Sequence, residues 1–138
     1  MEGRVDMTIR SSAEDAAGRQ ELCQTGHALV EKEEDGWRLR WTARDESGQR
    51  SGWDIRLCDA GVTIHSLSAG YVLELDVGRT TLLHLSINGL TAEMEVRTRR
   101  IFWSLDDEQE GRIELNYTML VKGETVSDIS LEMQLRKK

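Results

Sequence analysis

Apolar and polar residues alternate regularly in the last third of the chain. Apolar side chains occupy every second position from Ile113 to Met119 and again from Ile129 to Leu135, and a polar turn at 122–125 separates the two runs. Successive side chains of a β-strand point to opposite faces, so each run places its apolar groups on one face. The two runs are therefore predicted to form a long hairpin, whose apolar face needs a core supplied by the rest of the chain.

The same alternation occurs earlier, in shorter pieces. Strands are predicted at residues 5–9, 21–32, 37–43, 53–57, 62–64, 71–75, 83–87 and 92–98, the last continuing to Trp103. Turn signals lie between them at 35–36, 45–48, 59–61, 68–70, 77–78, 88–89 and 106–111. Asn88-Gly89 is the strongest of these signals, because both residues tolerate a positive φ. Turns at this spacing, with no convincing helix between strands, are typical of a sandwich or a barrel.

The segment 11–20 is small and polar and lacks an apolar stripe. Ser11 and Glu14 fit a helix-capping box, and Gly18 would be a suitable helix end, so one helical turn is an alternative here. A loop is favoured, because nothing apolar would hold a helix against the core. Gly26 is interpreted as a bend or bulge in the strand that follows.

The predicted fold class is all-β. Short connections favour a single antiparallel up-and-down β-barrel of eight to ten strands that occupies residues 1–138 as one domain, with a sandwich as the alternative. Closure of the barrel would remove the exposed edges that invite aggregation. The absence of proline is compatible with a chain made mostly of sheet.

The composition and charge limit the partners and the cellular location that can be expected. The chain has 138 residues and a net charge of −7, from 18 Lys and Arg against 25 Asp and Glu, which argues against nucleic acid as a partner. The cluster of Arg97, Arg99 and Arg100 is interpreted as an exposed strand edge, and the basic residues at 136–138 as a solvated tail. No apolar run is long enough to span a membrane, and no secretory signal begins the chain, so a cytoplasmic location is expected.

No motif predicts catalysis, a cofactor or a metal. His27, His65 and His84 are far apart in sequence and are expected at outward or rim positions. Cys23 and Cys58 are expected to be reduced thiols, and two cysteines alone cannot make a four-ligand zinc site. The acidic run 106–111 has glycine at the sixth position of a calcium loop but lacks the glutamate needed at the twelfth, so a turn is favoured.

Four tryptophans are the remaining unusual feature, and Trp37 and Trp41 share a face with Leu39. Core packing is the favoured role of these rings. The alternative is that they line a cavity, since a barrel of about eight strands is either packed solid or holds one small ligand. Candidate wall residues for a small apolar or amphipathic ligand are Trp37, Trp41, Tyr117, Met119 and Met133.

The closing hairpin resembles that of the YwiB-like family of small bacterial proteins. The similarity is carried by alternation after Gly111, by Gly123 in the turn, and by a basic end. It extends to an opening Val5-x-Met7-x-Ile9 strand, to Gly26, to Trp41-Thr42-Ala43, to Gly78, and to Val96-x-Thr98. The resemblance implies a calycin-like, or lipocalin-like, cytoplasmic β-barrel without an established activity.

Three functions compete on these grounds. The first is a non-enzymatic binding module that encloses the ligand described above, which the fold resemblance favours by analogy. The alternative is an interaction or homodimer module that uses the outer barrel surface, where Leu82 and Leu120 have outward parity and Phe102 breaks the alternation. An enzyme is the least favoured, because no titratable residues can be nominated for a site.

Overall fold

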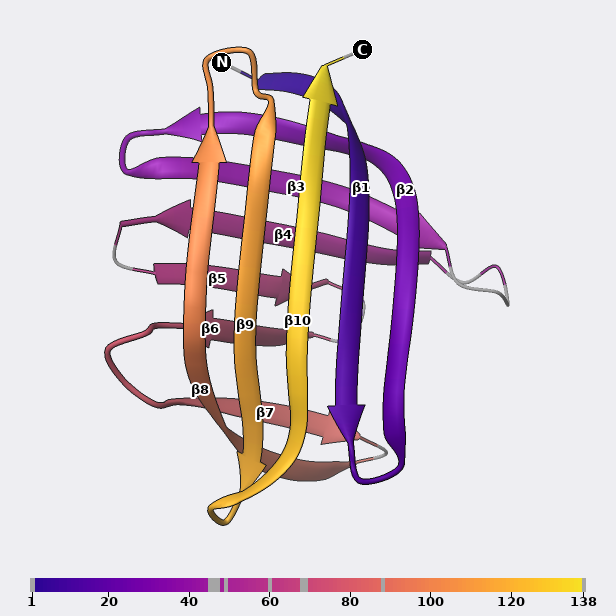
Figure 1. Cartoon of the computed structure of the whole chain (residues 1–138), viewed down its shortest axis with the longest axis vertical. Helices are drawn as coiled ribbons and strands as arrows, with labels where there is room; N and C mark the ends of the chain where they lie inside the picture. The colour runs from indigo at the N-terminus through magenta and orange to yellow at the C-terminus, as the bar shows by residue number, and fades with distance from the viewer. Residues whose placement is uncertain are drawn as a thin grey trace.

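The computed structural model describes residues 2–44, 48, 50–59, 61–67, 70–87 and 89–137. The described residues form ten β-strands and no helix. The strands are β1 (Glu2–Asp15), β2 (Gly18–Glu33), β3 (Gly36–Arg44), β4 (Arg50–Cys58), β5 (Gly61–Ser66), β6 (Tyr71–Leu75), β7 (Thr81–Ile87), β8 (Leu90–Leu105), β9 (Gly111–Val121) and β10 (Glu124–Lys137). They make one antiparallel sheet in the order β6-β5-β4-β3-β2-β1-β10-β9-β8-β7 (Figure 1). The all-β, up-and-down prediction is confirmed.

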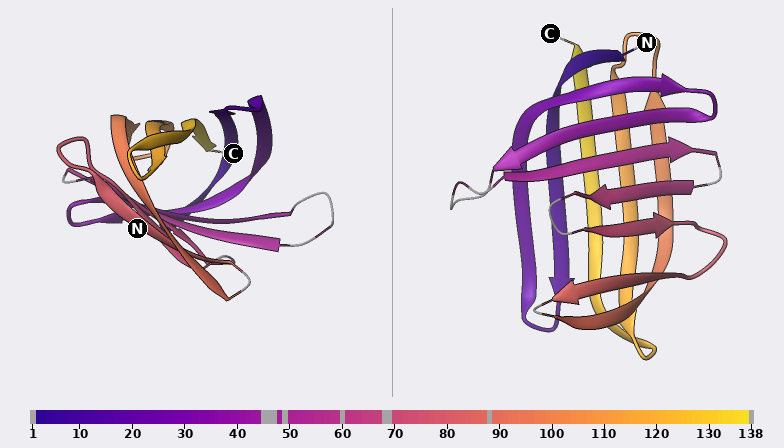
Figure 2. Two further views of the ribbon diagram at one scale, coloured as in Figure 1. Left: turned by 90° about the horizontal axis from the view of Figure 1, so that it is seen from below. Right: turned by 180° about the vertical axis from the view of Figure 1, so that it is seen from behind.

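The sheet folds over on itself into two layers whose strands cross (Figures 1 and 2). The first layer holds β9, β10 and β1 with part of β2 and part of β8, and the second holds β3 to β7. β2 and β8 bend from one layer into the other, and these bends make the corners of a barrel. The ends of the chain meet because β1 pairs with β10, from Val5 opposite Lys137 to Glu14 opposite Asp128.

The barrel is nearly closed, and the break in the ladder lies between β6 and β7. Two threonines bridge this seam. The Thr81 hydroxyl donates to the Glu74 carbonyl at 2.6 Å, and the Asp76 amide donates to the Thr98 hydroxyl at 3.1 Å. Both threonines are buried. Side-chain hydrogen bonds thus satisfy backbone groups that the sheet leaves unpaired at this seam.

The core lies between the two layers and is built from alternate positions of neighbouring strands. Leu39 of β3 has no exposed surface, and it is flanked across the sheet by Val30 and Ile55, which are equally buried. Ile113, Leu115 and Met133 supply the opposite wall from the closing hairpin. The apolar face of the closing hairpin thus packs against the core that the alternation predicts. The apolar faces of the other strands supply this core, because they point into the same interior.

The prediction of a loop at 11–20 is wrong. β1 continues to Asp15 and β2 begins at Gly18, so only a two-residue turn separates them. Residues 11–14 are extended because they pair on both sides, with β2 and with β10, and residues 18–20 are extended because they pair with β1. All of these pairings use backbone groups that need no apolar side chain. Gly26 causes no register shift, since the β1–β2 pairing runs without interruption past it.

The prediction that Leu120 faces outward to solvent is also wrong, because this side chain is only 3 % exposed. It lies outside the main core cluster, opposite Glu95 and Thr125. The register shifts between Thr98 and Arg100 and between Thr125 and Ser127 break the simple alternation in this part of the sheet. The turn predictions at Asp45–Ser47, Ala60, Ser68–Ala69 and Asn88 lie outside the described residues.

An ion pair between β3 and β4 makes stability depend on pH. Arg38 and Asp54 are joined by three hydrogen bonds, the shortest 2.6 Å from Nη2 to Oδ2, and the Asp54 side chain is 13 % exposed. Hydrogen bonding from Arg38 lowers the pKa of Asp54 below its ordinary range, against the opposing effect of burial. The native state therefore binds a proton at Asp54 less readily than the unfolded chain does.

We expect this pair to stabilise the fold above the ordinary Asp range and to lose that contribution as pH falls from about 5 toward 2. Asp54→Asn should lower the free energy of unfolding at neutral pH, and the difference from wild type should shrink in acid. Urea denaturation at a series of pH values measures this. Asp107→Asn is the matched control, since the Asp107 side chain is 98 % exposed. A constant difference between Asp54→Asn and wild type across the series would contradict the prediction.

Candidate functional site

An apolar surface groove lies where β2 separates from β3. The two strands pair only from Ala28 opposite Trp41 to Glu33 opposite Gly36, so the earlier part of β2 has β1 as its one partner among the described strands. The groove has a volume of about 340 Å³ and is called the lateral opening below. It is lined by Arg4, His27, Ala28, Leu29, Arg40, Trp41, Thr42, Trp53 and Leu67. Its size is within the range of small-molecule sites.

Aromatic rings form the inner wall of the lateral opening. Trp41 and Trp53 are cross-strand partners whose rings stack with centroids 6.2 Å apart and planes inclined by 17°. Tyr71 meets Trp53 edge to face at 6.4 Å. Leu67 is held over the opening by a hydrogen bond from its amide to the Gly52 carbonyl at 2.9 Å, and its side chain is 57 % exposed. The wall thus offers flat apolar surface that water still reaches.

Cationic and titratable groups stand around the rim. Arg4 has no ion-pair partner within the described part of the chain. Arg40 lies 3.9 Å from Glu31, a distance at the limit of an ion pair. His27 Nδ1 is 2.8 Å from Asp6 Oδ1, although this contact lacks the angles of a hydrogen bond. An apolar wall with a free guanidinium at its edge matches a ligand that is apolar at one end and anionic at the other.

Two tyrosines lie in the partly buried region that packs against the core. Burial raises the pKa of Tyr71. Burial raises the pKa of Tyr117 well beyond its ordinary range, with a smaller contribution from Tyr71. Both phenols therefore stay neutral at physiological pH, and they can donate hydrogen bonds without bringing a charge into the interior.

The structure distributes the five predicted wall residues over different environments. Trp37 and Met133 belong to the core, 6 % and 0 % exposed, and Tyr117 and Met119 are partly buried against it. Trp41, 9 % exposed, is the one of the five that lines the lateral opening. Sequence reasoning missed Trp53, whose register opposite Trp41 was the available signal. It also missed Arg4 and Leu29, which lie opposite each other on β1 and β2, and Leu67, which follows β5 where that strand pairs with β4.

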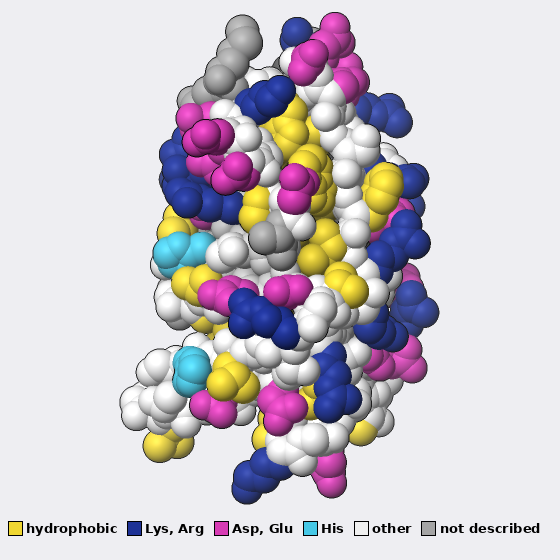
Figure 3. Space-filling model, turned by 90° about the vertical axis from the view of Figure 1, so that its left-hand side faces the viewer, with side chains coloured by type: hydrophobic (Ala, Val, Ile, Leu, Met, Phe, Trp, Pro, Cys, Tyr) yellow, Lys and Arg dark blue, Asp and Glu magenta, His cyan; other side chains and the backbone are white. Residues whose placement is uncertain are grey.

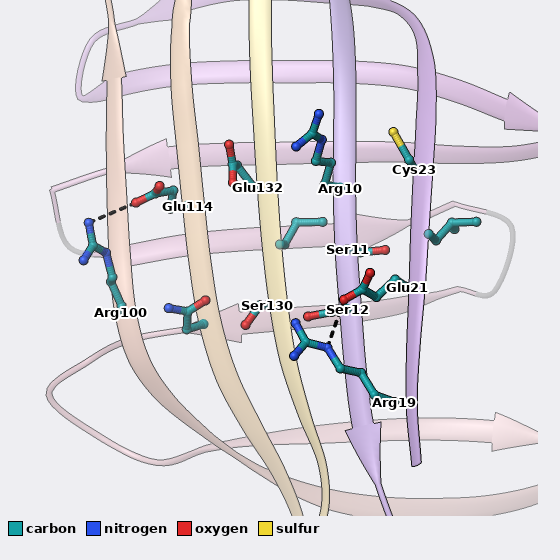
Figure 4. Close-up of a pocket in the computed structure, with 13 residues that line it drawn as sticks. Arg10, Ser11, Ser12, Arg19, Glu21, Cys23, Arg100, Glu114, Ser130 and Glu132 are labelled. Atoms are coloured by element: carbon teal, nitrogen blue, oxygen red, sulfur yellow. Dashed lines mark hydrogen bonds and ion pairs between the residues drawn. The ribbon is translucent and has the colours of Figure 1, made fainter. Parts of the chain in front are cut away.

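A second depression, more polar, lies on the outer face of β8, β9, β10, β1 and β2 (Figure 4). Its volume is about 760 Å³, and its floor is a cross-strand row of short side chains, Ser12, Ser130 and Asn116. Long charged side chains surround the floor, and two pairs of them are joined, Arg100 with Glu114 at 2.9 Å and Arg19 with Glu21 at 3.1 Å. Solvated charges that already pair with each other offer little to a ligand.

The described residues provide no other chemistry-bearing cluster. No group of three His, Cys, Asp or Glu among them is placed to hold a metal ion. Cys23 and Cys58 are free, and among the predicted outward histidines His27 and His84 are exposed while His65 is half-buried. The turn at 106–111 is built by the Asp106 carboxylate, which accepts hydrogen bonds from the amides of Glu108 and Glu110. In the described part of the chain, no helix of membrane-spanning length and apolarity occurs.

The fold and this opening define a class of protein: a small β-barrel whose described residues form ten strands, with an apolar groove in its side. A family model described as "Domain of unknown function (DUF1934)" matches residues 7–133, and the chain belongs to that family. No match was found among curated proteins.

One solved structure shows the same fold. The crystal structure of the ywiB protein from Bacillus subtilis is similar with a TM-score of 0.78 at 16% sequence identity, over 96% of this chain and 92% of that one. This confirms the fold and the predicted resemblance. A crystal structure of unknown function from Bacteroides ovatus has a TM-score of 0.40 at 12% identity, over 99% of this chain and 41% of that chain.

Proposed function

We propose that the protein is a non-enzymatic binding module for a small amphipathic ligand. The apolar part of the ligand lies on Trp41, Trp53 and Leu67 in the lateral opening, and its anionic group meets Arg4 at the rim. The observation that supports this role is an apolar groove walled by Trp41, Trp53 and Leu67, beside a guanidinium without an ion-pair partner in the described residues. Calycin-like ligand binding and a cytoplasmic location remain predictions from the family resemblance.

The opening, rather than the closed centre of the barrel, is where the ligand is placed. The side chains at the centre of the barrel have no exposed surface; they include Leu39, Ile55, Ile113 and Met133. A ligand there would have to displace close-packed side chains, which costs more than it gains. At the lateral opening it covers Leu29 and Leu67, which are 40 % and 57 % exposed without it.

Laurate and dodecanol test the proposal, because they share an alkyl chain and differ in charge. We expect both to change the tryptophan fluorescence, since two of the four tryptophans line the opening. Leu67→Ser should weaken laurate binding about fivefold to tenfold, the loss of about 1 kcal/mol of apolar contact. Leu82→Ser is the matched control, because Leu82 is 53 % exposed and lies outside the opening.

The rim charge is tested separately with Arg4→Gln. This substitution should weaken laurate and leave dodecanol unchanged, because only laurate carries the carboxylate that the guanidinium binds. Equal loss for both ligands would reject the role of Arg4. Equal binding of laurate by the Leu67→Ser and Leu82→Ser variants would reject the lateral opening as the site.

The alternative interaction surface predicted from Leu82, Leu120 and Phe102 is not a continuous apolar patch. Leu120 is buried, and the Phe102 ring lies beneath two guanidinium groups, those of Arg100 at 5.7 Å and Arg112 at 5.4 Å. Of the three, Leu82 alone is strongly exposed, and a single exposed leucine is ordinary. A homodimer therefore has to be argued from another part of the surface.

A further inference from the structure

β2 has a long stretch without a neighbour on one side. Residues 18–27 pair with β1, and the pairing with β3 starts only at Ala28. No other strand of the described chain pairs with these ten residues, which extend over about 33 Å. Their side chains are exposed except at Gln24 and Gly26, which are half-buried. A row of backbone donors and acceptors of this length is a template for another strand.

The direction of the backbone groups follows from the β1–β2 turn. Asp15 and Gly18 close a two-residue turn, and such a closing pair is hydrogen-bonded. Hydrogen-bonded pairs then alternate along the hairpin, so Gln20, Leu22 and Gln24 direct their amides and carbonyls to β1. Arg19, Glu21, Cys23 and Thr25 direct theirs to the free edge.

The other comparable edge of the barrel is protected and this one is not. β8 pairs with β7 only as far as Val96, so its later part also has one ladder. That part has a bulge between Thr98 and Arg100 and carries Arg97, Arg99 and Arg100, all exposed. Figure 3 shows Lys and Arg side chains gathered along the layer to which it belongs, on the right of that view. Bulges and charges of this kind keep strand edges from pairing.

The free edge of β2 lacks these devices over its centre. It has no proline, no lysine and no register shift, and its inward positions Gln20, Leu22, Gln24 and Gly26 carry no charge. Leu22 is 56 % exposed despite its inward parity, because no strand of the second layer covers it. Arg19 and Glu21 have outward parity and are paired with each other at 3.1 Å.

We infer that this edge pairs with the same edge of a second copy, antiparallel and with the twofold axis at Leu22. An antiparallel pair about a residue matches each position with its mirror position in the partner. This register places Leu22 against Leu22, Gln20 against Gln24 and Gly18 against Gly26. On the outer face it places Glu21 against Cys23 and Arg19 against Thr25, so that no like charges are opposed. A shift to an axis at Glu21 would oppose two glutamates.

The pairing joins the first layers of two barrels into one continuous sheet and buries both Leu22 side chains. It does not depend on the ligand proposed above, since the lateral opening begins at His27, where the edge ends. A peptide from another protein is the competing occupant of the edge. A second copy is favoured because residues 18–26 are complementary to themselves.

Light scattering after size exclusion tests the state of the whole chain. The wild type should have twice the monomer mass. Thr25→Pro should be monomeric with an unchanged circular dichroism spectrum, because its lost amide points to the free edge and not to β1. Leu22→Lys, which places a charge at the centre of the pair, should weaken the dimer at least about tenfold. Thr25→Ala is the matched control and should remain a dimer.

Cross-linking tests the register. In the proposed pair Leu22 faces Leu22 at a non-hydrogen-bonded position, where the Cα atoms are about 4.5 Å apart. That separation suits a disulfide. Leu22→Cys in a Cys23→Ser background should therefore form a covalent dimer on mild oxidation, whereas Gln20→Cys in the same background should not. A monomeric wild type, a dimer that survives both Leu22→Lys and Thr25→Pro, or equal cross-linking at positions 20 and 22 would overturn the proposal.

Discussion

Replacing Leu39 by alanine is expected to lower the free energy of unfolding by about 2–5 kcal/mol. Leu39 has no exposed surface and lies in the middle of β3, between the equally buried Val30 and Ile55 on its neighbours. Truncation removes buried apolar surface and leaves a cavity that the flanking strands, fixed by their ladders, cannot collapse to fill.

Urea denaturation followed by circular dichroism measures this effect. Leu82→Ala removes the same atoms from a side chain that is 53 % exposed and should change stability by less than about 0.5 kcal/mol. If the two alanine variants were equally stable, the interior between the two layers of the sheet would not be the principal core.

Replacing Gly111 by alanine is the second change expected to have a large effect. A Cβ atom at this position would lie 1.8 Å from the Ser104 carbonyl oxygen and 2.8 Å from its carbon, both backbone atoms of the neighbouring strand. Because Gly111 begins β9 opposite Leu105, the last residue of β8, relief of this clash requires the two strands to separate at their junction.

We expect Gly111→Ala to cost about 1–3 kcal/mol, as overpacking does, and to weaken amide protection in the adjacent ends of β8 and β9. Hydrogen exchange of the two strands locates the effect. Gly26→Ala is the matched control, because a Cβ there meets nothing within 4 Å. Gly26→Ala should be neutral or slightly stabilising, because alanine lowers the entropy of the unfolded chain. Similar losses for both glycines would contradict a deciding role for the close approach at Ser104.

The alternation of apolar and polar residues detects strands that have one buried and one solvent-exposed face, and this explains which predictions succeeded. It located the closing hairpin and the inward rows of β3 and β4, because one face of each strand is buried and the other is wet. It failed at 11–20, where the adjoining ends of β1 and β2 carry small and polar side chains and are held by backbone ladders, on two sides at residues 11–14 and on one side at residues 18–20. It failed at Leu120, where register shifts in β8 and β10 intervene.

The candidate site was predictable only in part. Trp41 was nominated as a wall residue of a cavity in the barrel interior, and the structure places it in the wall of the lateral opening instead; its role in ligand binding stays a prediction. Its neighbours Arg4 and Leu67 are far from it in sequence and come to it through the β1–β2 pairing and the β4–β5 pairing. No local pattern contains that information, because it depends on which strands are adjacent and on where β2 stops pairing with β3.

The sequence by itself determined the strands that have one buried face and most of the apolar residues of the core, because period two is a local property of an extended chain in a half-buried sheet. The tertiary structure alone decided where the barrel is closed and where it is open. The bends of β2 and β8 leave an apolar mouth on one side, an unprotected edge beside it, and an arginine-covered edge on the other strand. These features depend on how far each strand pairs with its neighbour. That extent is set by contacts between segments distant in the sequence, so no single segment encodes it.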